Sequence, residues 1–504
     1  MKKIQTALIS VYYKDYLDEI IQFLNNSGVQ IYSTGGTYDF IRSLGVEVKT
    51  VESLTGYPSI LGGRVKTLHP KVLGGILGRT TNQSDVDQMA EYDIPSFDLV
   101  IVDLYPFEET TTKTNDASEI IEKIDIGGIS LIRAGAKNFE DVFIVPSSDY
   151  YSELIEILHN QQCLTTIDDR RRFATYAFGV SSHYDAKIYE WMSGEKTDQL
   201  RISHKESSVL RYGENPHQTG IFHGDLNKLF NQLHGKELSY NNLLDLEAGL
   251  SLIDEFDETT FAILKHNNAC GLASRPTVKE SYESALAGDP VSAFGGVLVC
   301  NRTIDENTAE SMNSLFFEIV IAPDFEKNAL KIIQSRKNRI ILQRIGFDSQ
   351  KKIYKSILNG ILEQDRDSKS ETIADFKQVS IVQPTENELF DLVFANIVVK
   401  HTRSNAIVLV KDKQLLGSGV GQTSRVDALK QAIAKANEFN FDLNGAVMAS
   451  DAFFPFADSV EISTNAGITA VVQPGGSVRD QDTIDYCNSH GIGMVFTGIR
   501  HFKH

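Results

Sequence analysis

The sequence predicts an α/β protein built from more than one domain. Short apolar runs typical of buried strands alternate along the chain with stretches whose apolar residues recur at helical spacing. At 504 residues the chain is too long for one hydrophobic core, so two to four domains are expected. Its hydrophobic fraction of 41% and charged fraction of 23% are those of an ordinary globular protein.

Charge and cysteine content narrow the function classes. The net charge of −18 argues against nucleic acid or an anionic membrane surface as a partner, because both need a dominant basic field. The four cysteines are scattered without a CxxC pair, which indicates neither a disulfide framework nor a zinc site and fits a reducing cytoplasm. Residues 1–10 are expected to form a strand rather than a signal peptide, and no run has the length of a membrane span.

The amino-terminal part begins with a βαβ unit. A strand is predicted at 7–10, a helix over 17–24 and a second strand at 29–32. Ser33-Thr34-Gly35-Gly36-Thr37 then opens another helix, and small residues with free N–H groups at such a turn suit a phosphate. A Gly-Gly turn also occurs for packing alone, so the motif by itself leaves phosphate binding open.

A basic loop follows at 62–70, Gly-Gly-Arg-Val-Lys-Thr-Leu-His-Pro. It places two cations and an imidazole between glycines and a proline, which favours an anionic substrate over simple exposure. The strand predicted at 99–102 leaves Tyr105 near its carboxyl end, because Pro106 stops the strand.

Asp125 precedes the helix predicted to begin at the Gly127-Gly128 pair. Its carboxylate can cap that helix, or it can act as an acid or base beside Lys66 and Lys137. A strand at 142–145 closes the predicted sheet, and a long amphipathic helix spans 168–191.

The polar stretch 193–199 lacks any periodicity, and we place a domain boundary there, between 1–192 and 200–504. Soon afterwards 211–218, Arg-Tyr-Gly-Glu-Asn-Pro-His-Gln, gathers a cation, an aromatic ring and an imidazole around a tight turn. This density favours anion binding.

The second part centres on a buried strand predicted at 261–264, which ends in Lys265-His266-Asn267-Asn268. An imidazole beside an ammonium group indicates a base next to an oxyanion stabiliser. For the Lys-His dipeptide alone, polar residues that merely end a strand are the simpler interpretation.

A weak internal repeat is expected in this part. Residues 397–401 repeat the apolar run followed by Lys-His at 264–266, and each copy precedes an Ala-Phe pair, at 293–294 and 452–453. We infer two copies of one α/β unit, roughly 200–365 and 380–504, with the site between them.

Taken together, the motifs resemble the bifunctional purine biosynthesis enzymes that join an aminoimidazole-carboxamide ribonucleotide (AICAR) transformylase to an inosinate (IMP) cyclohydrolase. The matching stretches run in the family's order: Ser33–Thr37, Arg64–Pro70, Leu104–Phe107, Asp125–Gly128, Arg211–Gln218, Leu264–His266, Asp451–Phe456 and Arg500. The resemblance implies a methylglyoxal-synthase-like, Rossmann-type domain that closes the purine ring. It further implies two cytidine-deaminase-like α/β units that transfer a formyl group from 10-formyltetrahydrofolate.

The resemblance also implies residue roles. In formyl transfer His266 would take the proton of the attacking amine, Lys265 would stabilise the oxyanion and Asn405 would orient the groups. In ring closure the implied proton-transfer residues are Lys66, Tyr105, Asp125 and Lys137. The implied binding residues are Ser10, Lys14, Ser33, Thr34, Gly35, Gly36, Thr37, Arg64 and Thr67 in the first domain, and Arg211, Tyr212, Phe294, Gly295, Glu318, Arg425, Phe454, Asp458 and Arg500 in the second.

Nucleotide and folate are thus the implied small-molecule partners, and the transformylase site is implied to form across a homodimer. No zinc is expected, because the His-x-Glu and Pro-Cys-x-x-Cys ligands of zinc deaminases are missing from the sequence. A monovalent cation stays open, and the expected compartment is the cytoplasm.

Three positions depart from the family's pattern. Val11-Tyr12-Tyr13-Lys14 replaces the more usual Ser-Asp-Lys, Asp103 stands where asparagine is common, and Glu318 replaces an aspartate. These departures leave the roles of Lys14, Asp103 and Glu318 open.

Two other function classes remain at this stage: an enzyme with only one active half, and a nonenzymatic nucleotide sensor. Candidate residues in both halves favour the bifunctional enzyme, and turnover would separate an enzyme from a sensor.

Overall fold

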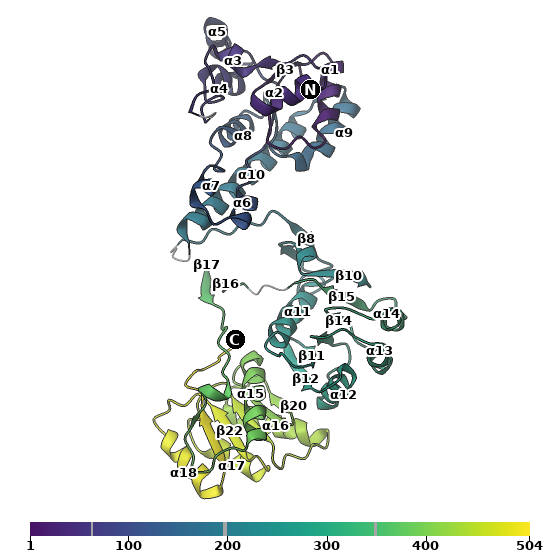
Figure 1. Ribbon diagram of the computed structural model, residues 1–504, viewed down its shortest axis with the longest axis vertical. Coiled ribbons are helices and arrows are strands. Elements are labelled where there is room, and N and C mark those ends of the chain that lie inside the picture. Colours follow the sequence, from purple (N-terminus) through teal and green to yellow (C-terminus); the bar gives the residue numbers. More distant parts are fainter. Residues whose placement is uncertain (62–63, 195–198, 347–349) are drawn as a thin grey trace. The chain divides into compact units, whose positions relative to one another are not determined.

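The computed structural model describes residues 1–61, 64–194, 199–346 and 350–504. The chain divides into two compact units, Met1–Lys205 and Glu206–His504 (Figure 1). Part of the polar stretch predicted as a boundary, 195–198, lies outside the described residues, as do Gly62 and Gly63 of the basic loop. Among the helices that the structure describes, none combines the length and apolar character needed to cross a membrane.

The amino-terminal unit is built on a parallel sheet, in which the described strands follow the order β4-β3-β2-β5-β6. The strands are β2 (Thr6–Ser10), β3 (Gln30–Ser33), β4 (Lys49–Thr50), β5 (Leu99–Val102) and β6 (Phe143–Val145). A short antiparallel pair, β1 (Lys2–Lys3) and β7 (Leu164–Thr165), lies apart from this sheet. The strands predicted at 7–10, 29–32, 99–102 and 142–145 are confirmed, with small shifts at their ends.

Helices cover both faces of this sheet. Strand residues alternate between two cores, so that Ile9 packs with α1, α2 and α9 while Leu8 packs with α4, α8 and part of α10. The helices are α1 (Leu17–Asn26), α2 (Gly35–Ser43), α3 (Val51–Thr55), α4 (Pro70–Leu77), α5 (Gln83–Glu91), α6 (Phe107–Lys113), α7 (Ala117–Ile121), α8 (Gly127–Lys137), α9 (Tyr151–Gln161) and α10 (Ile167–Ser193).

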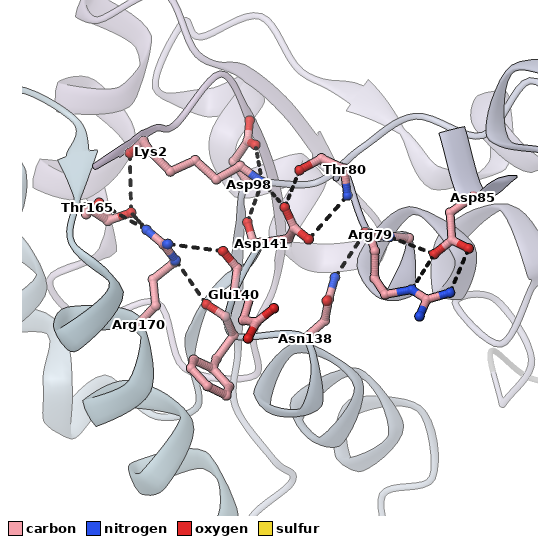
Figure 2. A network of polar contacts seen from close by, with 12 residues as sticks. Lys2, Arg79, Thr80, Asp85, Asp98, Asn138, Glu140, Asp141, Thr165 and Arg170 are labelled. Carbon is pink, nitrogen blue, oxygen red and sulfur yellow. Dashed lines mark hydrogen bonds and ion pairs between the residues drawn. The ribbon is translucent and has the colours of Figure 1, made fainter. Parts of the chain in front are cut away.

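A polar network closes the end of the sheet at which β2, β5 and β6 begin (Figure 2). Asp141 accepts hydrogen bonds from Lys2 Nζ at 3.2 Å and from the backbone N–H and hydroxyl of Thr80. Arg170 of α10 donates to the carbonyls of Phe139 and Glu140 at 2.9 and 3.0 Å. Burial opposes ionisation of Asp141, but its hydrogen bonds and the Lys2 charge outweigh burial and lower its pKa. Substrate-binding groups are therefore expected at the opposite, carboxyl end.

The carboxy-terminal unit is built on one large mixed sheet. Its described strands follow the order β10-β15-β14-β13-β11-β12-β20-β19-β21-β22-β23-β18. They are β10 (Phe230–His234), β11 (Thr260–Lys265), β12 (Asn268–Ser274), β13 (Val297–Cys300), β14 (Ile319–Ala322), β15 (Ile340–Arg344), β18 (Lys377–Gln378), β19 (Ile407–Lys411), β20 (Gln414–Gly419), β21 (Val447–Ser450), β22 (Ala470–Gln473) and β23 (Gly493–Phe496). Two short antiparallel pairs lie outside this sheet: β8 (Ser207–Val209) with β9 (Ile221–His223), and β16 (Lys352–Ile357) with β17 (Gly360–Asp365).

The two halves of this sheet follow the same plan. In one half β11 pairs antiparallel with β12 and β13, and β13, β14 and β15 run parallel. In the other half β19 pairs antiparallel with β20 and β21, and β21, β22 and β23 run parallel. The halves meet where β12 pairs with β20.

Helices α11 and α15 share one core that spans both halves. On the other face, α12, α13 and α14 pack on the first half, and α16, α17 and α18 pack on the second. Figure 1 shows α11 on one side of β11 and β14, with α13 and α14 on the other. The helices are α11 (Tyr240–Ile253), α12 (Val278–Gly288), α13 (Glu306–Asn313), α14 (Lys327–Ile333), α15 (Glu386–His401), α16 (Arg425–Glu438), α17 (Asp458–Asn465) and α18 (Asp480–His490).

The alignment predicted for the internal repeat is wrong. Residues 397–401 lie in α15 rather than in a strand, and the counterpart of β11 is β19. The turn after Lys265 corresponds to the turn after Lys411, since both continue with two residues of positive φ. The Ala-Phe pair at 293–294 precedes β13, whereas the pair at 452–453 follows β21. A short apolar run does not distinguish a buried helix from a strand, and this ambiguity caused the error.

Candidate functional site

A cavity of about 790 Å³ lies at the carboxyl ends of β2 and β5 and at the amino-terminal ends of α2 and α8. This is the edge of a parallel sheet at which ligands bind. The structure brings together these predicted site residues in its lining: Ser10, Lys14, Thr34, Gly36, Thr37, Arg64, Lys66, Thr67, Tyr105 and Asp125.

The first turn of α2 forms an anion-binding end of this cavity. The hydroxyl of Thr37 donates to the carbonyl of Val11 at 2.8 Å, and Thr34 donates to Glu52 at 3.0 Å. With these hydroxyls engaged, the backbone N–H groups of the first turn are the groups left for an anion. Ser33 is fully buried and its hydroxyl donates to the carbonyl of Ile9 at 2.7 Å, so this hydroxyl has a structural partner, and its contact with a ligand stays a prediction.

Cations from three segments face this end. Lys66 lies beside the start of α2, since a Cβ added to Gly35 would lie 3.5 Å from its Nζ. Lys14 donates to the carbonyl of Tyr12 at 2.8 Å, and burial lowers the pKa of its ammonium group while the charge of Asp103 opposes that effect. Arg64 pairs with Glu122 at the exposed rim. The positive charge needed for a phosphate is therefore present.

Asp125 lies at the start of α8. Its Oδ1 accepts a hydrogen bond from the backbone N–H of Gly128 at 2.6 Å, and a Cβ on Gly128 would lie 2.7 Å from its Oδ2. The glycine is required for this close approach. Burial raises the pKa of Asp125, although hydrogen bonds and the charge of Lys66 oppose the shift. Asp125 thus caps a helix and also presents a carboxylate to the cavity.

Asp103 and Tyr105 follow β5. Asp103 is 7% exposed and accepts hydrogen bonds from the backbone N–H groups of Tyr12 and Tyr13, the latter at 3.0 Å. Its carboxylate therefore holds the loop after β2, and burial raises its pKa to about 6. Burial also raises the pKa of Tyr105, so this phenol keeps its proton at neutral pH.

Lys137 does not reach this cavity within one chain. It is the last residue of α8, which places it about 15 Å along the helix from Gly127, and its side chain is exposed. The prediction that it lies beside Lys66 and Asp125 is corrected for the single chain. The spacing along α8 could have shown this, because Asp125 and Lys137 flank opposite helix ends.

Sequence reasoning missed several lining residues, among them Glu122, Lys123 and Ile126. Each lies within three positions of Asp125, so proximity to a motif was the available indication. Tyr12 also lines the cavity, although the sequence marked it only as a departure from the family's pattern.

In the carboxy-terminal unit, Lys265 and His266 lie at the turn between β11 and β12. Lys265 Nζ donates to the carbonyls of Phe294 and Gly295 at 2.9 and 3.2 Å. The N–H of Asn267 donates to Asp245 Oδ1 at 2.7 Å, which fixes the turn, and burial raises the pKa of Asp245. The imidazole of His266 is exposed and has no hydrogen bond to a side chain or backbone group in the described residues.

An ion cluster lies near this turn, where β14 begins. Glu318 Oε1 lies 2.7 Å from Lys236 Nζ and 3.7 Å from Arg211 Nη2. Arg211 also donates to the hydroxyl of Tyr212 at 3.0 Å. Lys236 was not among the predicted site residues, because it lies outside every motif. The longer side chain of Glu318 is accommodated by these two cations.

Two exposed aromatic rings lie beside Lys265. Phe294 is 62% exposed and packs against Phe316, whose ring centroid lies 4.9 Å away. Exposed rings at this position offer a flat apolar surface to a planar ligand.

The remaining predicted residues belong to the second half of the sheet. Asn405 donates from Nδ2 to the carbonyl of Gln422 at 2.9 Å. Arg403, two positions earlier, donates its N–H to Asn268 Oδ1 at 3.0 Å, which links this loop to the turn that carries His266. The loop that carries Asn405 is therefore linked to the Lys265 turn by the hydrogen bond between Arg403 and Asn268.

Phe454 and Arg425 have contacts that differ from the predicted ones. Phe454 is fully buried in the core beneath α16 and α17, and its role in ligand binding stays a prediction. Arg425 Nη2 lies 3.1 Å from Asp451 Oδ1, whose side chain is fully buried, while Arg425 Nε has no hydrogen-bond partner among the described residues. Asp458 and Arg500 are exposed.

Comparisons with known proteins agree with this arrangement of units. A family model described as AICARFT/IMPCHase bienzyme matches residues 135–435, and a model described as an MGS-like domain matches residues 16–130. The fold, the cavity and these matches define an α/β bienzyme whose amino-terminal unit is MGS-like.

The relatives narrow this class further. The chain is 59% identical to the bifunctional purine biosynthesis protein PurH of Bacteroides thetaiotaomicron, over 100% of this chain and 99% of that protein. It is 45% identical to the proteins of the same name from Caldicellulosiruptor saccharolyticus and Aquifex aeolicus, over 99% of this chain in both cases and 99% and 100% of those proteins. The chain belongs to the PurH family, and it is a bifunctional AICAR formyltransferase and IMP cyclohydrolase of purine biosynthesis. The first activity implies formyl-tetrahydrofolate as cosubstrate.

Proposed function

We propose that the two activities are divided between the two units, with ring closure in the amino-terminal cavity and formyl transfer at the Lys265 turn. The observation that carries this assignment is the gathering of Lys66, Tyr105 and Asp125 in one cavity beside the first turn of α2. The anion-binding end suits the phosphate of a ribonucleotide, and the acid and base groups suit proton transfer.

For ring closure, the carboxamide nitrogen of the formylated ribonucleotide attacks the formyl carbon and water leaves. Asp125, whose pKa burial raises, is suited to exchange a proton with the attacking nitrogen. Tyr105 keeps its proton at neutral pH and can donate it to the departing oxygen. Lys66 stabilises negative charge on that oxygen, and Lys14, Arg64 and the first turn of α2 hold the phosphate.

For formyl transfer, the amine of AICAR attacks the formyl carbon of 10-formyltetrahydrofolate. His266 takes the amine proton, because its imidazole is exposed and free of hydrogen bonds to other described residues. Lys265 stabilises the oxyanion, and tetrahydrofolate leaves as its nitrogen takes up the proton that His266 accepted. Arg211 and Tyr212 hold the ribonucleotide, while Phe294 offers a surface to a planar ring.

We propose the domain bounds, the compartment and the oligomeric state from the resemblance to the bifunctional purine biosynthesis enzymes. Residues 1–192 are the IMP cyclohydrolase domain, and 200–504 are the transformylase domain with two cytidine-deaminase-like units at roughly 200–365 and 380–504. The matching plans of the two half-sheets support this division. The chain acts in the cytoplasm as a homodimer that shares the transformylase site, to which Asn405, Asp458 and Arg500 contribute. The transformylase site uses no zinc. A monovalent cation is the metal ion whose effect on formyl transfer should be measured.

Two matched variants test the assignment. His266→Ala is expected to abolish formyl transfer and leave ring closure of supplied formylated ribonucleotide intact, and Lys66→Ala is expected to do the reverse. Tetrahydrofolate and IMP are followed separately by absorbance. Loss of both activities in either folded variant would show that the two sites are not independent, and the assignment would then be wrong.

The oligomeric proposal has its own test. Mixing His266→Ala protein with Asn405→Ala protein is expected to restore part of the formyl transfer, because a mixed dimer would hold one site that carries neither substitution. Sedimentation should show a dimer. A monomer with full activity would refute the shared site.

A further inference from the structure

Tyr12 stands in the loop after β2, within the segment where this chain departs from the family's pattern. Its side chain is 43% exposed and lines the amino-terminal cavity. Its backbone is held on both sides, since its N–H donates to the Asp103 carboxylate and its carbonyl accepts from Lys14 Nζ at 2.8 Å. The direction in which the ring leaves the backbone is therefore fixed.

The ring of Tyr12 contacts the ring of its neighbour Tyr13 at a centroid distance of 5.0 Å, and it also contacts two side chains that come from other loops. The Tyr105 ring lies edge-on at a centroid distance of 5.6 Å and an interplanar angle of 72°. The ammonium group of Lys123 lies 5.7 Å from the centre of the Tyr12 ring, within the range of a cation–π contact. Both partners also line the cavity. Tyr12 thus joins the loop after β2 to the loop after β5 and to the segment before α8.

The hydroxyl of Tyr12 has no hydrogen-bond partner among the described residues, and its backbone groups make the polar contacts. By contrast, the neighbouring Tyr13 donates its hydroxyl to Glu109 at 2.7 Å and does not line the cavity. The side-chain contacts of Tyr12 are therefore made by its ring and not by its hydroxyl.

We propose that Tyr12 is a positioning residue for ring closure, whose ring holds the Tyr105 phenol and the Lys123 ammonium group in place at the cavity wall. The proposal rests on the assignment of ring closure to this cavity. Without the ring, the side chains of Tyr105 and Lys123 lose a shared neighbour and gain other rotamers. Because proton donation depends on placement to within about 1 Å, the chemical step slows while the phosphate-binding end is unchanged.

The test compares Tyr12→Ala with Tyr12→Phe. Tyr12→Ala is expected to lower kcat for ring closure roughly tenfold, the loss expected for one aromatic pair and one cation–π contact, with KM changed less than kcat. Tyr12→Phe keeps the ring and is expected to recover most of that loss. Tyr92→Ala is the truncation control, because Tyr92 is 60% exposed in the same unit and does not line the cavity.

Three outcomes would overturn the proposal. Equal losses for Tyr12→Phe and Tyr12→Ala would assign the effect to the hydroxyl. A rise in KM at unchanged kcat would assign the ring to direct substrate binding. A kcat for Tyr12→Ala within twofold of the parent would leave the ring without a role.

Two further measurements separate this proposal from others. Trp191 fluorescence of the same preparations shows whether a loss comes from unfolding of the amino-terminal unit, because the single tryptophan lies in α10 of that unit. If Lys66→Ala retained ring closure, the site assignment itself would fail. A normal Tyr12→Ala beside an inactive Lys66→Ala would refute only the role of Tyr12.

Discussion

Replacing Asp103 by asparagine removes a buried side chain that can ionise. The carboxylate accepts the backbone N–H groups of Tyr12 and Tyr13, and an asparagine of the same shape has one oxygen rather than two. These two hydrogen bonds favour the ionised carboxylate and so oppose the effect of burial on its pKa. Burial is the larger effect and raises the pKa of Asp103 from an ordinary value of 3.8 to about 6.

The size of the charge effect follows from this shift. A folded-state pKa above the unfolded value means that the native protein binds the proton more tightly. The resulting stability is fully present below pH 3.8 and is lost as the pH rises through about 6. The full effect is about 3 kcal/mol, of which about 1.4 kcal/mol disappears between pH 5 and pH 8. Asparagine does not ionise, so the variant lacks this component.

The single tryptophan makes the measurement specific to the amino-terminal unit. Trp191 lies in α10 and contacts the Phe107 ring at a centroid distance of 6.0 Å. Urea unfolding followed by Trp191 fluorescence, at several pH values, gives the free energy of unfolding for the parent and for Asp103→Asn. The stability of the parent relative to the variant should fall by about 1.4 kcal/mol from pH 5 to pH 8.

A control with the opposite sign is available in the same unit. The pKa of Asp141 is lowered, so its stabilisation is present at neutral pH and is lost as the pH falls through the folded-state pKa. The parent should therefore gain stability relative to Asp141→Asn as the pH rises through the acid range below about pH 5, and this difference should stay constant from pH 5 to pH 8. A parent-to-Asp103→Asn difference that stays constant from pH 5 to pH 8 would refute the raised pKa and the burial argument behind it.

Three other predictions concern the carboxy-terminal unit. Phe454→Ala should lower the free energy of unfolding by about 3–5 kcal/mol because it empties a core position, whereas Phe453→Ala, at a partly exposed ring, should cost far less; thermal unfolding compares them. Arg425→Met should destabilise the unit by about 3–5 kcal/mol because Asp451 keeps a buried charge without its partner, and adding Asp451→Asn should restore part of the loss in a calorimetric scan. Lys265→Met should slow formyl transfer by about 10²-fold or more, measured as tetrahydrofolate release, with ring closure unchanged; an intact rate would remove Lys265 from the proposed mechanism.

The amino-terminal sheet could be predicted because its sequence pattern is local. Each strand is a short apolar run bounded by turn residues, and the intervening helices carry one apolar face, as in α1 with Leu17, Ile20, Ile21 and Leu24 buried. The predicted cavity residues follow from the same logic, since carboxyl ends of parallel strands share one edge.

Other features depend on contacts that no local pattern encodes. Residues 397–399 form a continuous apolar run because this end of α15 is buried, in part within a core shared by both halves, and such a run has no polar face to reveal its period. Phe453 and Phe454 are adjacent in one motif, yet one is 37% exposed and the other fully buried. The burial of one ring is decided by the helices packed above it, not by the motif.

The contact between β12 and β20, where the two half-sheets meet, determines whether the carboxy-terminal unit could be split into two separate proteins. Few groups form it: the N–H of Ser274 donates to the carbonyl of Lys413 at 3.0 Å, and Arg275 reaches the carbonyl of Asp412 and the side chain of Gln414. Beneath this thin seam, α11 and α15 lie in one undivided apolar core. A gene cut between β17 and β18 would yield two fragments, and each would expose an apolar face that the other covers in the intact unit. Such fragments should be insoluble when made singly and should reassemble when made together. Although the two half-sheets follow the same plan, neither half is then an independently folding unit.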